Sequence, residues 1–153
     1  MKQKKTVCFT IKSSWHAIAR VYNEQAAQHG LSASIGYVLL NLDLEQGTPA
    51  TKIGPLIGTE SRSLTRMLKS LEENGLIYKQ QDKADKRMVK IFLTDRGKEK
   101  REIAKEVVKK FNKVVSSVIS EDKLSIFFEV MEKINEIAES KNIYKPENTF
   151  KHE

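Results

Sequence analysis

A short segment of the sequence carries hydrogen-bond donors at helical spacing. Between residues 61 and 69, side chains with N–H or O–H groups recur three and four residues apart, which places them on one side of a helix. These donors are Ser61, Arg62, Ser63, Thr65, Arg66 and Lys69. The other side of the same helix is apolar, with Leu64, Met67, Leu68 and Leu71. One face can therefore pack, while the opposite face can donate hydrogen bonds to an external acceptor.

A second group of cations follows in a polar stretch at residues 81–87. The segments on either side, 76–80 and 88–93, have the alternating pattern of strands, so the polar stretch is predicted to be the exposed tip of a hairpin. The cations at this tip are Lys83, Lys86 and Arg87. For Arg87, an ordinary surface ion pair with Asp82 or Asp85 is the alternative.

Positive charge is concentrated in the middle third of the chain. Residues 52–101 hold 13 Lys or Arg and 7 Asp or Glu, whereas the 153-residue chain as a whole has a net charge of +7. Basic groups clustered in one module suit binding to a polyanion, because neutralising its phosphates releases counterions. A solvated basic surface would give the same balance, so charge alone leaves both interpretations open.

The predicted elements place both groups of donors in one module. Helices are expected at about 9–29, 34–45, 51–57, 60–73, 94–118 and 120–138, with the hairpin between the fourth and fifth. Ile11, Trp15, Ile18 and Tyr22 should form the buried stripe of the first helix. Pro55 removes one backbone donor, so the third helix should be short or start late. The fold class is mainly α with a small β-hairpin wing, a winged helix-turn-helix whose donor-bearing helix fits a DNA major groove.

Three sequence motifs resemble those of the MarR family of bacterial regulators. They are Gly75-Leu76-Ile77, Asp85-Lys86-Arg87 and Leu93-Thr94-Asp95-Arg96-Gly97, and the resemblance covers about residues 10–140. It implies a homodimer that binds a pseudo-palindromic DNA operator, acts as a repressor and is released by a small amphipathic ligand. By position, Arg87 would enter the minor groove, with Asp85 steadying it, and the donors of 61–69 would face the major groove.

The resemblance also implies a division of the chain. Residues 1–30 and 95–145 would form the helical dimerisation region, and residues 31–94 the DNA-binding domain. Residues 146–153 are expected to be a loose C-terminal tail. The apolar stripes at 103–118 and 124–138 favour an interface between subunits, although a monomeric helical hairpin is the alternative.

Aromatic residues near the first two helices are candidates for an effector pocket. They are Trp15, Tyr22 and Tyr37, together with His16. Family resemblance places effector sites between the dimerisation helices and the winged module. Aromatic residues at helical spacing are more often simply part of the core.

Cys8 suggests an alternative function, in which a peroxide- or thiol-responsive regulator is switched through this residue. Some MarR-like sensors of organic peroxides carry a cysteine near the start of the first helix. A reactive thiolate needs nearby positive charge, and Lys5 and Lys12 are close in sequence. A thiol without a role is the simpler interpretation.

Other classes of function find no support in the sequence. There is no nucleophile elbow and no phosphate-binding glycine loop, so an enzyme is not expected. The three histidines lack metal-ligand spacing, and neither a cofactor nor a membrane span is predicted. The single cysteine favours a cytoplasmic protein. A helical protein-interaction module that does not bind DNA is the remaining alternative.

Overall fold

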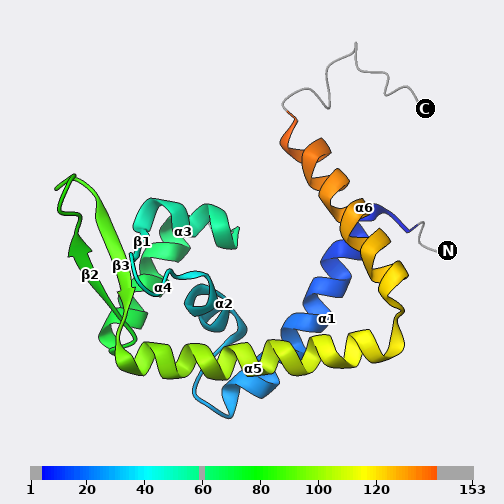
Figure 1. Cartoon of the computed structure of the whole chain (residues 1–153), viewed down its shortest axis with the longest axis horizontal. Helices are drawn as coiled ribbons and strands as arrows, with labels where there is room; N and C mark the ends of the chain where they lie inside the picture. Colours follow the sequence, from blue (N-terminus) through cyan, green and yellow to red (C-terminus); the bar gives the residue numbers. More distant parts are fainter. Residues whose placement is uncertain (1–4, 59–60, 141–153) are drawn as a thin grey trace. The chain divides into compact units, whose positions relative to one another are not determined.

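The described part of the chain folds into six helices and a small antiparallel sheet, which confirms the mainly α fold with a β wing. The computed structural model describes residues 5–58 and 61–140 (Figure 1). Two compact units divide the chain, one ending at Lys110 and the other starting at Phe111. The elements are α1 (Val7–Ala27), α2 (Ala33–Asn41), β1 (Thr48–Pro49), α3 (Ala50–Ile57), α4 (Ser61–Glu73), β2 (Ile77–Gln81), β3 (Val89–Leu93), α5 (Asp95–Val118) and α6 (Glu121–Glu139).

The hydrophobic core of the first unit lies among α2, α3, α4 and the sheet. Leu39 of α2, Ile53 of α3 and Ile91 of β3 are each at most 1% exposed. Other buried members of this core are Val38, Leu42, Leu64, Leu68, Leu71, Leu76, Ile77 and Leu93. Because α4 and both hairpin strands contribute to one core, packing fixes α4 relative to the wing.

The sheet contains a strand that the sequence did not predict. β1 pairs with β3, and β3 pairs with β2, giving the order β1-β3-β2. The second helix was expected to reach residue 45, but α2 ends at Asn41 and Leu42 is extended. The Asp43 carboxylate accepts hydrogen bonds from the amides of Glu45 and Gln46, which stabilises a turn. A two-residue strand is too short for an alternating pattern to reveal it.

The third helix is short, as expected, but it does not start late. α3 has eight residues and begins at Ala50, with Pro55 in its second half. Gly58 follows in the left-handed conformation, with φ of 62°. A proline this far into a helix removes one hydrogen bond to the preceding turn, and α3 ends two residues later.

The first helix is less buried than its stripe predicted. Trp15 is 50% exposed and Ile11 36% exposed, while Ile18 and Tyr22 are half-buried. On α1 only Ala26, near its C-terminal end, is buried within this single chain. The physical reason is length, because α2 has 9 residues and cannot cover all of a 21-residue helix.

A single threonine connects the end of α4, the wing and the start of α5. The Thr94 hydroxyl donates to the Gly75 carbonyl at 2.6 Å and accepts the Gly97 amide at 3.0 Å. The Thr94 amide donates to the Leu76 carbonyl at 3.1 Å. A Cβ on Gly97 would overlap that same carbonyl oxygen. These contacts explain in physical terms why the sequence has Leu-Thr-x-x-Gly at this point.

The second unit contains the last turns of α5 and all of α6. Phe127 and Phe128 contact each other edge to face, with ring centroids 5.5 Å apart, and are 53% and 62% exposed. Leu124, Met131 and Ile134 of the predicted stripe are half-buried. The C-terminal tail predicted for 146–153 lies outside the described residues.

None of the helices described is both long enough and apolar enough to cross a lipid bilayer.

Candidate nucleic-acid interface

Helix α4 has one buried face and one exposed face. Leu64, Leu68 and Leu71 are buried against the core, at 8%, 6% and 1% exposure. The predicted donors Arg62, Ser63, Thr65, Arg66 and Lys69 are all exposed. Ser61 begins the helix, but its side chain lies outside the described residues, as do Thr59 and Glu60. The helical register predicted from the sequence is the one found in the structure.

The charged side chains of α4 differ in their partners. Lys69 lies 3.8 Å from Glu73 on the same helix, and Glu72 pairs with Lys79 of β2 at 2.6 Å. Within residues 5–58 and 61–140, no carboxylate pairs with Arg62 or Arg66. In that part of the chain, the hydrogen-bond donors of their guanidinium groups are therefore not used by a carboxylate.

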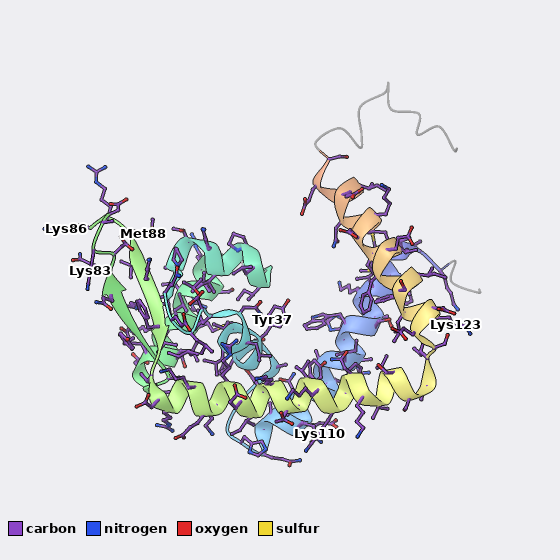
Figure 2. The ribbon with its side chains drawn as sticks, in the orientation of Figure 1. Tyr37, Lys83, Lys86, Met88, Lys110 and Lys123 are labelled. Carbon is purple, nitrogen blue, oxygen red and sulfur yellow. The ribbon has the colours of Figure 1, made fainter. Side chains whose placement is uncertain are left out.

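The wing is a regular antiparallel hairpin, and its residues Ile77, Ile91 and Leu93 are buried in the core. Ile77 pairs with Leu93 and Lys79 with Ile91 across the two strands. Its turn lies at the opposite end of the hairpin from the start of α5 (Figure 1). Lys83 and Lys86 project from that turn (Figure 2). The predicted cationic tip is thus held out from the core by two paired strands.

Asp82 organises the wing tip, a role that the sequence did not reveal. Its carboxylate accepts the amides of Ala84 and Asp85 at 2.8 and 3.0 Å and pairs with Lys90 at 2.8 Å. Its side chain is only 15% exposed. The hydrogen bond from the Lys90 ammonium, followed by the two amides, lowers the pKa of Asp82 from 3.8 to about 2. An aspartate two residues before the amide it accepts is the sequence signal of such a turn.

Asp85 contacts the backbone of Arg87. Its carboxylate accepts the Arg87 amide at 3.0 Å, while Met88 donates to the Asp85 carbonyl at 2.9 Å. No ion pair joins Arg87 to Asp82 or Asp85 in the described structure, and Arg87 is exposed. The carboxylates therefore shape the turn from which the Arg87 side chain extends.

The pH dependence of the wing tip follows from Asp82. Because folding lowers its pKa, Asp82 stabilises the fold above pH 3.8, and this contribution is lost as the pH falls through about 2. In a carbon NMR titration, the Asp82 carboxyl should therefore have a midpoint near 2. In Lys90→Gln, which removes the largest cause of the shift, the midpoint should move toward 3.8. Equal midpoints in both proteins would show that Lys90 does not hold this carboxylate.

A comparison with known protein families finds a match to the part of the chain that runs from α2 to the wing. The family model described as the MarR family matches residues 31–89, from before α2 to the start of β3.

Over residues 31–89 the chain is similar to the MarR family.

Relatives and solved structures agree with this similarity. The HTH-type transcriptional regulator TtmR of Methylorubrum extorquens is 38% identical over 92 residues, which span 60% of this chain and 47% of that regulator. A crystal structure of the S. aureus MepR–DNA complex matches with a TM-score of 0.79 and 19% identity, over 87% of this chain and 98% of that one. The structure of overoxidized AbfR bound to DNA matches with a TM-score of 0.64 and 28% identity, over 86% and 91%. These matches are to a transcriptional regulator and to proteins of the same fold, and the chain spans about half the length of TtmR.

The aromatic pocket candidates are only partly brought together. Trp15 and Tyr37 contact each other edge to face, with ring centroids 6.5 Å apart. Together with Tyr22 they line a cavity bounded by α1, α2 and α5. His16 is exposed and lines neither this cavity nor the second one beside Trp15. Among the described residues, no group of three or more His, Cys, Asp or Glu side chains could hold a metal ion.

Cys8 is exposed in the first turn of α1. Thr6 caps that turn, since its hydroxyl accepts the Phe9 amide at 3.2 Å. The sulfur therefore lies at the surface of the single chain and not among core residues.

Proposed function

We propose that this chain is a repressor that binds double-stranded DNA as a homodimer, on a pseudo-palindromic operator. The observation that carries the proposal is the exposed face of α4. Its guanidinium groups at Arg62 and Arg66 have no carboxylate partner in the described structure, and α4 shares a core with a cationic wing. A helix with free donors beside a basic hairpin fits one major groove and the neighbouring minor groove.

The side chains would have separate roles. Arg62, Ser63, Thr65 and Arg66 would reach base edges and phosphates in the major groove, with Ser61 and Lys69 at the ends of this surface. Arg87 would enter the minor groove, where narrow A·T-rich DNA attracts arginine. Lys83 and Lys86 would contact phosphates, and Asp85 would hold the backbone from which Arg87 extends. MepR, which shares this fold, has been solved in a complex with DNA, which supports DNA as the partner.

Exposed apolar side chains in both units support a homodimer. On α1, Val7 and Phe9 are 54% and 50% exposed, and α6 exposes Ile126, Phe127 and Phe128. Large apolar surfaces of this kind are rarely left in water. A second copy would cover them, using residues 1–30 and 95–145 for dimerisation and residues 31–94 for DNA. Such a regulator would act in the cytoplasm and release DNA when a small amphipathic effector binds.

Selection of bound fragments from random DNA tests this proposal. The expected result is two inverted half-sites whose centres are about 10 base pairs apart or a multiple of that, because the helical repeat must match the dimer. The Arg66→Ala variant should enrich these fragments much less under the same conditions. Recovery of single, unrepeated sites, or of no preferred sequence, would contradict the proposal.

A second candidate mechanism is a redox switch at Cys8. The exposure of this thiol in the first turn of α1 favours it. AbfR, which is similar in fold, can be oxidised, as its overoxidized complex with DNA shows. Oxidation of an exposed thiol adds oxygen atoms and charge at that position. In this mechanism the change at Cys8 takes the place of effector binding.

The Cys8→Ser variant separates the two mechanisms. The unmodified protein should lose operator affinity on peroxide treatment, whereas Cys8→Ser should keep it, since serine cannot form a sulfenic acid. Operator binding is measured before and after peroxide, with added reductant as the reversal control. If Cys8→Ser still releases DNA on oxidation, the redox switch at this residue is excluded.

A further inference from the structure

A further cavity of the first unit lies where α1 ends, α4 ends and α5 begins. Its volume is about 150 Å³. Its floor is apolar and buried, with Leu31, Leu71 and Leu76 at 7%, 1% and 5% exposure. Of the described residues that line it, none belongs to the surface proposed for DNA. Polar side chains complete the lining: His29, Ser70, Asn74, Arg96 and Lys100.

The cations of this cavity have no counterion. Arg96 and Lys100 lie one turn apart on α5, and His29 lies in the loop after α1. No Asp or Glu side chain lines the cavity, and none pairs with these three side chains over 5–58 and 61–140. Lys98 of the same helix, by contrast, lies 3.8 Å from Asp95. Positive charges held together without a carboxylate repel each other, and a bound anion would remove that repulsion.

The carbonyl groups at the two helix ends do not account for these cations. The Ala26 carbonyl of α1 accepts the His29 amide at 2.9 Å, and the Leu71 carbonyl of α4 accepts the Leu76 amide at 2.9 Å. Lys100 donates one hydrogen bond, to the His29 carbonyl in the loop. A helix end carries about half a negative charge, so two ends offset only about one of the two positive charges of Arg96 and Lys100. The cavity therefore keeps a positive balance.

The donors of the cavity match a phosphate group better than a carboxylate. A phosphate monoester carries about −1.5 to −2 charges at pH 7 and three acceptor oxygens. A carboxylate has a single charge and two oxygens. The Arg96 guanidinium offers a fork of donors, the Lys100 ammonium has donors besides the one given to His29, and Ser70 adds a hydroxyl. The apolar floor suits an organic group attached to the phosphate.

We propose that this cavity binds the phosphate group of a small phosphate monoester. The phosphate lies against Arg96 and Lys100, and the ester group packs on Leu31 and Leu71. The ligand joins the loop after α1, the end of α4 and the start of α5, since residues of all three line the cavity. The site does not depend on the proposed function, because its residues are not those proposed to contact DNA.

Three small anions test the ligand class: propyl phosphate, inorganic phosphate and butyrate. Each is added to the full chain at constant ionic strength, and the amide signals of Gly30 and Asn74 are followed by nitrogen NMR. Propyl phosphate should bind about tenfold more tightly than the other two, because inorganic phosphate leaves the floor uncovered and butyrate has less charge. Equal binding of all three anions, or no binding of propyl phosphate, would overturn the proposal. So would signal changes confined to Arg62 and Arg66, which would assign the phosphate to the DNA surface.

Arg96→Gln is the first variant and should weaken propyl phosphate binding by about tenfold or more. The Arg96 side chain has neither an ion pair nor a hydrogen bond within the described part of the chain, so its replacement leaves the folded contacts intact. Lys98→Gln is the matched control, because Lys98 is an exposed cation of the same helix outside the cavity. It should leave the affinity unchanged. Equal losses in the two variants would show that only overall charge matters, and the site would be lost.

Ser70→Leu separates the cavity from a general basic surface. Leucine at this exposed position of α4 fills the cavity and keeps every charge, so the affinity for propyl phosphate should again fall by about tenfold. If folded Ser70→Leu binds propyl phosphate as the unmodified chain does, the site is not this cavity. Operator binding by the unmodified chain is measured in parallel. Its absence would count against the proposed function alone, whereas absence of phosphate binding would count against this inference alone.

Discussion

Arg66→Ala is expected to weaken operator binding by about 1–3 kcal/mol, or roughly fivefold to 150-fold. Arg66 is exposed on the face of α4 opposite Leu64 and Leu68, and no carboxylate of the described residues competes for its guanidinium group. If Arg66 contacts base edges, discrimination between operator and random DNA should fall as well. If it contacts a phosphate, the slope of log affinity against log salt should decrease by about one. Fluorescence anisotropy at several salt concentrations measures both quantities.

Arg20→Ala is the matched control for this prediction. Arg20 is also an exposed arginine, but it lies on α1, outside the proposed DNA surface. Replacing Arg20 removes the same charge. The affinity for the operator should therefore change only by the small amount that the lower net charge causes. Equal losses in the two variants would mean that only overall charge matters, and the assignment of α4 as the recognition helix would fail.

Gly97→Ala is expected to destabilise the fold by about 3 kcal/mol, although alanine normally favours a helix over glycine by about 1 kcal/mol. Gly97 lies in the first turn of α5, where a Cβ would overlap the carbonyl oxygen of Leu76 and approach Leu93. The carbonyl belongs to the backbone and accepts the Thr94 amide, so it cannot move aside without breaking that bond. Urea unfolding at one fixed protein concentration measures the change.

Gly30→Ala is the comparison for this second prediction. Gly30 has a φ of 68°, and a Cβ there would meet nothing within 4 Å. Its replacement should cost about 1 kcal/mol from backbone strain alone. A free energy of unfolding for Gly97→Ala equal to or above that of the unmodified chain would contradict the steric explanation.

The sequence predicted the elements with strong periodicity. The bounds of α4 and of the two hairpin strands were predicted to within about one residue. The apolar residues recur at helical spacing in α4 and at strand spacing in the hairpin. The helix expected at 94–118 is α5, and Thr94 accepts the Gly97 amide in its first turn. These features depend on local spacing, which a single sequence displays directly.

What could not be predicted depends on contacts between distant residues. β1 is defined only by its pairing with β3, some forty residues later, as in Thr48 opposite Ile91. The stripe on α1 was predicted to be buried, but periodicity shows which residues share a face and not whether another element covers that face. The wing tip gives a second example of a contact that the sequence did not reveal. Asp82 and Arg87 looked like possible partners by charge, whereas the hairpin register brings Asp82 to Lys90.

The Thr94 junction has a consequence for how a signal can travel. One residue bonds to the segment that leaves α4, to the segment that enters β2 and to the first turn of α5. A rotation of the start of α5 must therefore carry both DNA-facing elements with it, in the same direction and by a similar angle. In the proposed complex, each subunit would then release its major-groove and minor-groove contacts together, because the contacts of the helix could not be lost while the hairpin stays in place.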